Sequence, residues 1–144
     1  MIRYFTFLLF IFTTHVFAAN NSPVGLWKTI DDNTSKPRSL VRISEQNGVY
    51  SGVVEKGLDP SDPPDRVCDK CTDARKNQSI IGMTILQGVH QKGDVFEDGE
   101  ILDPDNGKIY RCKLKILEDG KKLEVRGFIG ISLFGRSQIW LREE

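Results

Sequence analysis

The chain has 144 residues, 28% of them charged, and its 20 basic residues are balanced by 20 acidic ones. Because no surplus of positive charge is available to attract phosphates, we expect no nucleic-acid partner. The length corresponds to one ordinary domain with a single core, and only two histidines are present for acid–base chemistry.

Residues 1–18 have the composition of a secretory signal peptide. Arg3 supplies the positive start, residues 5–12 are apolar apart from Thr6, and Ala18 ends a short cleavage pattern. The apolar stretch is too short for a membrane-spanning helix, which makes an uncleaved anchor the less favoured alternative, and no later segment is long enough to span. We therefore predict a leader over 1–18 and one exported domain over 19–144, periplasmic or secreted.

The remainder alternates apolar and polar residues in short runs, which is typical of strands. All 13 glycines and all six prolines lie after the leader, and no stretch of 11 residues shows a helical apolar period. The pattern predicts eight strands, at residues 24–31, 38–45, 49–56, 80–87, 95–102, 108–117, 121–129 and 136–142.

The first clear hairpin turn is Asn47-Gly48, since both residues tolerate the positive φ of a type I′ turn. This turn places Val41 opposite Val54. A long irregular stretch over 57–79 follows the hairpin, and its prolines exclude a regular strand ladder.

Cys68 and Cys71 lie in that stretch at CxxC spacing. In an oxidising compartment the favoured interpretation is a disulfide between them, which shapes the loop. Alternatives are a redox site, a zinc site completed by Cys112 and His90, or pairing of one loop cysteine with Cys112. Covalent haem would need histidine where Thr72 stands, so we expect neither cofactor nor metal.

The sequence offers no constellation for catalysis. His90 is the only histidine after the leader and is expected in an exposed turn over 88–94. Asp103 and Asp105 are explained as turn formers within Asp-Pro-Asp-Asn-Gly. We therefore expect no enzyme, with an enzyme of unrecognised type as the minor alternative.

Two later turns set further pairings. Asp105-Asn106-Gly107 is expected to place Ile101 beside Cys112 and Glu100 beside Lys113. Asp119-Gly120 is expected to place Cys112 opposite Gly127, which makes Cys112 a small buried apolar residue. The basic residues of 108–115 then form a solvated sheet face, which lipid would not tolerate.

Residues 127–135 contain neither charge nor proline. If this segment lies at an open rim, Ile131, Leu133 and Phe134 form an exposed patch. If it folds inward, the same side chains plug the barrel floor. The second interpretation is favoured because a small barrel has few other large apolar residues to seal it.

Consecutive hairpins form an antiparallel meander, and a Trp lies near each end of it, Trp27 and Trp140. A meander hides its edge strands best by closing on itself. The predicted fold is therefore all-β, a single small antiparallel eight-stranded barrel, closed or nearly closed, with the first and last strands paired. Such a barrel is filled by side chains or holds one small ligand.

Several motifs in order resemble the bacterial exported proteins grouped as domain of unknown function 2147, which have a lipocalin-like or calycin-like barrel. The motifs lie at residues 25–29, 68–71, 80–83, 101–104, 106–108 and 125–136. In the lipocalin pattern the tryptophan of the first strand lies at the barrel floor beneath a basic side chain of the last strand. The resemblance thus implies barrel closure by Trp27 with Arg142, or else with Arg136.

Two functions remain open at this point. The first is an exported, non-enzymatic lipocalin-like monomer that binds a small hydrophobic molecule, with candidate lining residues Trp27, Tyr110, Cys112, Leu114 and Val125. The alternative is a filled barrel that presents loop 57–79 or loop 130–135 to an envelope protein. An enclosed cavity of roughly 300 Å³ or more favours the ligand, and continuous packing favours the scaffold.

Overall fold

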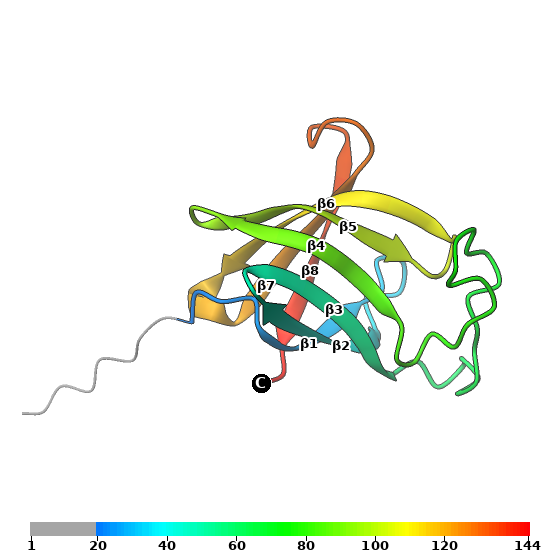
Figure 1. The fold of residues 1–144 in the computed structure, drawn as a ribbon. Helices are drawn as coiled ribbons and strands as arrows, with labels where there is room; N and C mark the ends of the chain where they lie inside the picture. The colour runs from blue at the N-terminus through cyan, green and yellow to red at the C-terminus, as the bar shows by residue number, and fades with distance from the viewer. Residues whose placement is uncertain (1–19) are drawn as a thin grey trace, which may run out of the picture.

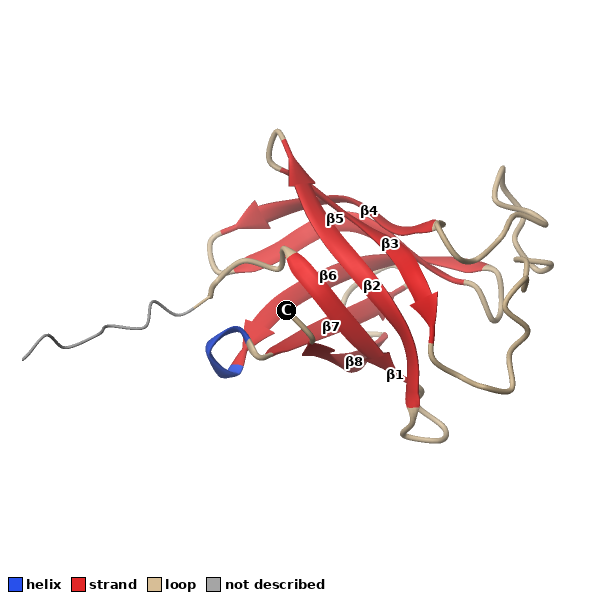
Figure 2. Ribbon diagram, turned by 90° about the horizontal axis from the view of Figure 1, so that it is seen from below, coloured by secondary structure: helices blue, strands red, loops and turns tan. Residues whose placement is uncertain are grey.

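A computed structural model describes residues 20–144, so the predicted leader over 1–18 lies outside the described residues. The strands are β1 (Gly25–Ile30), β2 (Pro37–Gln46), β3 (Val49–Gly57), β4 (Thr84–Lys92), β5 (Val95–Asp103), β6 (Lys108–Leu117), β7 (Lys122–Phe128) and β8 (Gly135–Arg142). Within the described residues the only helical element is the short 3₁₀ turn η1 (Glu118–Gly120). Figures 1 and 2 show the strands wrapping around a common axis.

The eight strands form one closed antiparallel barrel in chain order, which confirms the predicted fold class. Closure depends on β1 and β8, where Trp27 pairs with Arg142 and Lys28 with Leu141. The ladder is extended by a backbone hydrogen bond from Glu143 N to Leu26 O of 2.8 Å. A closed barrel leaves no unpaired edge for other chains to extend.

Two of the three predicted turns give the expected register. Val41 lies opposite Val54 across β2 and β3, and Cys112 lies opposite Gly127 across β6 and β7. Both turns use residues with positive φ, including Asn47 at 52° and Asp119 at 54°. Local turn chemistry was sufficient here because the turn residues lie at the centre of each hairpin.

The predicted register of β5 and β6 was wrong by two residues. Ile101 pairs with Tyr110 rather than with Cys112, and Glu100 lies opposite Arg111 rather than Lys113. The turn is centred one residue earlier than expected, because Gly107, at φ 73°, closes a four-residue loop through a bond to Asp103 O. A shift of two residues keeps every side chain on its face of the sheet.

The fourth strand was placed too early. β4 runs from Thr84 to Lys92 instead of over 80–87, and His90 lies on its outer face rather than in a turn. Gly88, at φ 71°, does not end the strand. It forms a local irregularity that faces Gly99 of β5, where any Cβ would overlap the Val89 side chain.

One half of the barrel is packed solid. Tyr50 and Phe96 meet edge to face there, with ring centroids 5.0 Å apart. Side chains that are at most 1% exposed fill this half: Trp27, Val41, Ile43, Leu86, Phe96, Cys112, Leu114 and Leu123. The other half of the interior is not filled by side chains in this way.

Candidate functional site

The two ends of the barrel differ in their covering. The turns β2–β3, β4–β5 and β6–β7 lie at one end together with residues 20–24, whereas the four longer connections lie at the other. These are residues 31–36, the β3–β4 loop (residues 58–83), residues 104–107 and the β7–β8 loop (residues 129–134). The first end is called the closed end below, and the second the open end.

The closed end is fastened by Arg142. Its guanidinium lies 4.2 Å from the ring centroid of Trp27, which is fully buried. The same group donates to the carbonyl oxygens of Ser22 at 2.7 Å, Val24 at 2.8 Å and Gly120 at 2.5 Å. Burial lowers the pKa of Arg142, but a guanidinium remains charged at physiological pH. Arg142 therefore connects the N-terminal segment, the last strand and the β6–β7 turn.

The geometry separates the two candidate closure cations. Arg136 lies at the opposite end, where its Nε is 3.3 Å from Asp32 Oδ2. Gly25 shows why the first strand carries Gly-x-Trp, since a Cβ there would lie 2.6 Å from Arg142 Nη1. The Trp27 indole adds its own bond, donating to Pro23 O at 2.7 Å.

A cavity of about 1270 Å³, which includes the space between the rim loops, extends into the other half of the interior and opens to solvent at the open end. Its wall is apolar and aromatic, and its rim is formed by the four connections of that end. Wall residues from seven strands are Thr29, Val54, Ile85, Ile101, Leu102, Tyr110, Val125, Gly127 and Trp140. The volume lies above the usual range of roughly 300–1,000 Å³ for small-molecule pockets.

Two of the five predicted lining residues line the cavity, Tyr110 and Val125. Trp27, Cys112 and Leu114 also point inward, but they lie in the packed half and do not line the cavity. Sequence reasoning missed Trp140 as a wall residue. The sequence did contain a signal for this role, because period-two alternation along the last strand predicts that Trp140 points inward.

Polar groups at the wall are joined in a short chain. Trp140 Nε1 donates to Gln138 Oε1 at 3.2 Å, and Gln138 Nε2 donates to Asp32 Oδ2 at 2.8 Å. Arg136 completes the chain through its ion pair with Asp32. No buried side-chain nitrogen or oxygen among residues 20–144 lacks a partner. An occupant therefore needs few hydrogen-bonding groups to match the cavity wall.

Two arginines fasten the β3–β4 loop across the rim. Arg38 contacts Asp59, Asp62 and Asp105, each at 2.9 Å. Arg66 contacts Asp62 at 3.0 Å and Asp105 at 2.5 Å. Burial alone would raise the pKa of Asp105, but hydrogen bonds from Arg66 and Arg38 outweigh it and hold that pKa below the ordinary 3.8. We call these five residues the rim clasp.

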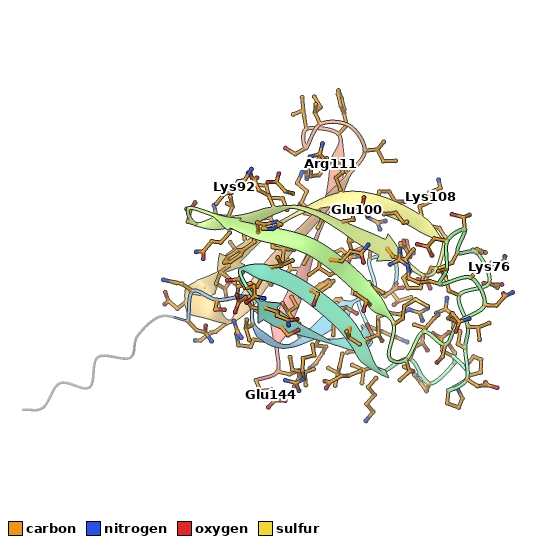
Figure 3. All side chains as sticks on the ribbon, viewed as in Figure 1. Lys76, Lys92, Glu100, Lys108, Arg111 and Glu144 are labelled. Carbon is orange, nitrogen blue, oxygen red and sulfur yellow. A yellow bond between two sulfur atoms is a disulfide. The ribbon has the colours of Figure 1, made fainter. Side chains whose placement is uncertain are left out.

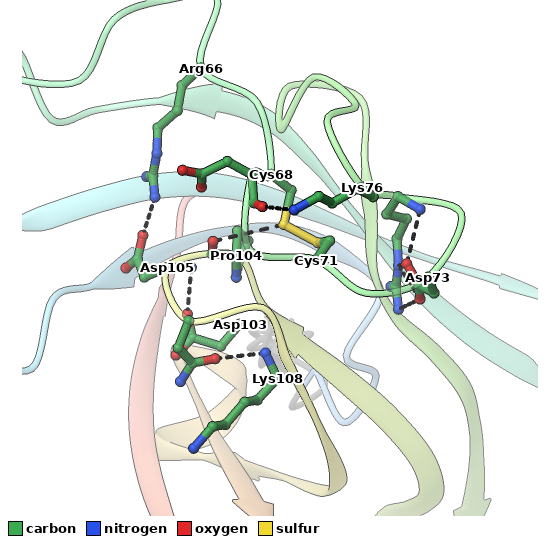
Figure 4. The surroundings of a disulfide bond; sticks show 12 residues. Arg66, Cys68, Cys71, Asp73, Lys76, Asp103, Pro104, Asp105 and Lys108 are labelled. Atoms are coloured by element: carbon green, nitrogen blue, oxygen red, sulfur yellow. Dashed lines mark hydrogen bonds and ion pairs between the residues drawn. A yellow bond between two sulfur atoms is a disulfide. The ribbon is translucent and has the colours of Figure 1, made fainter.

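The predicted disulfide between Cys68 and Cys71 is present. Both cysteines are buried, and the turn they form packs on residues 104–107, as Figure 4 shows. Cys68 Sγ lies 3.9 Å from Pro104 O, and a Cβ at Gly107 would overlap the Lys70 carbonyl. The disulfide therefore gives the β3–β4 loop the shape that fits the neighbouring turn.

Asp105→Asn should loosen the β3–β4 loop at neutral pH. The amide lacks the negative charge that two guanidinium groups share, so both bonds weaken. Limited trypsin digestion, which cuts after the basic residues of this loop, should become several-fold faster. Asp65→Asn is the matched control, because Asp65 is exposed on the same loop and forms no ion pair within residues 20–144.

The wild-type clasp should also open in acid. A carboxyl whose pKa is lowered in the folded state contributes stability above its unfolded pKa, near 3.8, and loses it as the pH falls through the lower folded value. The protection factors for hydrogen exchange in the β3–β4 loop, which are corrected for the intrinsic pH dependence of exchange, should therefore fall below about pH 4. Digestion of Asp105→Asn at the wild-type rate would show that the clasp does not hold the loop.

Cys112 is a free cysteine that is 1% exposed. Burial, with a smaller contribution from the charge of Glu100, raises the pKa of its thiol to about 12. The thiolate is the reactive form, so Cys112 should not react with a thiol reagent at pH 8 while the protein is folded. Denaturant should release one reactive thiol per chain, and a second or third would contradict the disulfide.

Within the described part of the chain, no group of three or more His, Cys, Asp or Glu is arranged to hold a metal. The Nδ1 of His90 lies 2.9 Å from Gly88 O on the outer wall, away from the cavity. Asp103 and Asp105 accept bonds within their turn and in the rim clasp. Each of these three side chains therefore has a structural partner.

The β7–β8 loop does not plug the barrel, so the favoured prediction for this segment was wrong. Its apolar side chains are exposed: Ile129 68%, Ile131 59%, Leu133 74% and Phe134 72%. The floor is sealed at the other end by Trp27, Arg142 and residues 20–24, so no plug is needed there. The loop instead lies at the rim of the cavity.

A closed eight-stranded barrel with one sealed end and one open cavity is the architecture of the lipocalin-like class. The fold is similar to a solved structure described as "Protein HP1028 from the human pathogen Helicobacter pylori belongs to the lipocalin family". The TM-score is 0.74 at 20% identity, and the match covers 85% of this chain and 84% of that chain. The likeness shows a lipocalin-like fold.

Residues 25–142 match the family model described as uncharacterized protein conserved in bacteria (DUF2147). The chain belongs to that family, as the motifs of its sequence indicated. No curated protein matches the sequence. None of the helical structure within residues 20–144 is long and apolar enough to cross a membrane.

Proposed function

We propose that this protein is an exported, non-enzymatic lipocalin-like carrier that takes a small, largely apolar molecule into its open-end cavity. The observation that carries the proposal is the cavity of about 1270 Å³. A filled barrel would leave no such space, and roughly 300 Å³ already accommodates a small ligand.

The wall indicates the chemistry of the occupant. Val54, Ile85, Ile101 and Val125 offer aliphatic contacts, and the Trp140 indole offers an aromatic one. Burial of apolar ligand surface against such side chains supplies about 25 cal/mol per Å² before the costs of binding. A largely apolar molecule with few hydrogen-bonding groups therefore fits best.

The rim disfavours an anionic head group. Seven of the rim and wall residues are acidic and four are basic, which leaves an excess of three negative charges. The acidic residues are Asp31, Asp32, Glu55, Asp59, Asp62, Asp103 and Asp105, and the basic ones are Arg38, Lys56, Arg66 and Arg136. A neutral or cationic apolar molecule should bind more tightly than a carboxylate of the same size.

Export is supported by chemistry as well as by the leader-like sequence of residues 1–18. A structural disulfide such as Cys68–Cys71 forms and persists in oxidising compartments, and it is rare in the cytosol. We therefore place the folded barrel outside the cytoplasm, in the periplasm or beyond.

Native mass spectrometry of protein purified gently from its own host tests the carrier function. The expected result is a population with added mass that dissociates on activation and is extracted by organic solvent. If the protein carries no added mass and binds no apolar probe, the alternative of an interaction module without a small-molecule ligand replaces the proposal.

A further inference from the structure

The β7–β8 loop presents a compact apolar tip. Figure 1 shows the loop standing clear of the barrel between β7 and β8. Residues 129–134 contain no charge, and their four large apolar side chains are 59–74% exposed. Isolated exposed hydrophobics need no explanation, but four within six residues form a patch that does.

The loop has a defined shape. Arg126 Nε donates to Ser132 O at 2.7 Å, and Arg126 Nη2 donates to Leu133 O at 3.3 Å. Phe134 N donates to Ile131 O at 3.1 Å, which closes a turn at the tip. Arg126 thus fixes two loop carbonyls to the barrel, and the apolar side chains remain exposed.

The size of the patch argues against a protein partner. Four side chains expose a few hundred Å², whereas a stable protein interface buries about 800 Å² on each partner. In a dimer formed through this loop, both copies would contribute too little apolar area for a stable interface. A lipid bilayer has no such requirement, because it surrounds an inserted loop on all sides.

Positive charge lies at the base of the same loop. Arg111 stacks on Phe128 with its guanidinium 5.8 Å from the ring centroid, and Figure 3 shows it close beneath the loop. Arg126 reaches the loop from β7. Within residues 20–144, neither arginine forms an ion pair with a carboxylate. Guanidinium groups behind an apolar tip are placed to contact lipid phosphates.

We propose that the β7–β8 loop docks the barrel on the surface of a phospholipid bilayer. Leu133, Phe134 and Ile131 insert among the acyl chains, and Arg111 and Arg126 contact phosphates. Ile129, Leu133 and Phe134 also border the cavity mouth, so docking brings that mouth to the membrane. This docking is independent of the carrier function and stands even if the cavity binds nothing.

Sedimentation with vesicles tests the proposal. The chain from Ala19 onward is used so that the apolar residues 5–12 do not contribute, and it retains every strand of the barrel. Phosphatidylcholine vesicles, whose phosphates Arg111 and Arg126 can contact, should sediment with the wild type. The double variant Leu133→Ser/Phe134→Ser should bind at least about tenfold more weakly.

The matched control removes two exposed apolar side chains elsewhere, Val24→Ser/Ile139→Ser, where the wild-type exposures are 41% and 39%. This control should bind vesicles like the wild type. Circular dichroism establishes that both double variants fold. Binding of N-phenyl-1-naphthylamine in the cavity is measured separately, so that failure of docking and failure of the carrier function are distinguishable.

A second measurement locates the contact. Phe134→Trp should shift its emission to the blue on vesicles and be quenched by brominated lipid chains. The proposal is overturned if the wild type does not sediment with vesicles, or if Leu133→Ser/Phe134→Ser sediments equally well. It is also overturned if ultracentrifugation finds a dimer that this double variant converts to a monomer, because the patch would then be a self-interface.

Discussion

Replacing Arg142 with alanine should destabilise the barrel by about 2–4 kcal/mol, because the change removes charged hydrogen bonds and a cation–π contact together. The carbonyls of Ser22, Val24 and Gly120 lose their common donor, and the Trp27 ring loses its cover. Urea denaturation, with the free energy of unfolding extrapolated to water, measures the effect.

Arg136→Ala is the matched control. Arg136 is 68% exposed at its side chain and contacts only Asp32 among charged residues of the described chain, so its loss should change the free energy of unfolding by less than about 0.5 kcal/mol. Arg142→Lys should fall between the two, since an ammonium keeps the charge but cannot bridge three carbonyls. Equal effects of Arg142→Ala and Arg136→Ala would contradict the account of the closed end.

Gly127→Leu should weaken probe binding without weakening the fold. A Cβ at Gly127 would meet Tyr110 Cβ at 3.5 Å and Ile101 Cγ2 at 3.8 Å, which are ordinary contacts, and the rest of the side chain would extend into the cavity. Because glycine weakens a strand, the replacement should be neutral or slightly stabilising. Binding of N-phenyl-1-naphthylamine should weaken at least about tenfold.

Lys115→Leu serves as the control for this change. It adds the same leucine side chain to the outer face of β6, where Lys115 is exposed. Fluorescence titration should give wild-type affinity for Lys115→Leu. If Gly127→Leu also retained wild-type affinity, the probe would bind somewhere other than the cavity.

The parts of the fold that the sequence predicted are those fixed by neighbouring residues. Asn47-Gly48 determines which residues of β2 and β3 face each other, and period-two alternation determines which side chains point inward. Gly88 was misjudged because a glycine that breaks one strand can form a bulge in another, and only its partner strand decides between them.

The site depended on longer-range geometry. Inward-facing Val125 and inward-facing Leu114 have the same pattern in the sequence, yet one lines the cavity and the other lies in the packed half. The two residues are direct partners across β6 and β7, so which of them reaches the cavity depends on strand tilt and on the side chains packed around each, which no local motif encodes. The plug was wrongly favoured over the exposed rim because the floor is sealed by residues 20–24 and Arg142, far away in sequence.

The most direct test of the carrier function is a methyl NMR titration with N-phenyl-1-naphthylamine. We predict that the methyl signals of Val54, Ile85 and Val125 shift in a saturable way at one probe per chain, since these side chains line the cavity. The signals of Val41 and Ile43, in the packed half, should stay in place. Shifts confined to the outer surface, or none at all, would contradict a ligand-binding cavity.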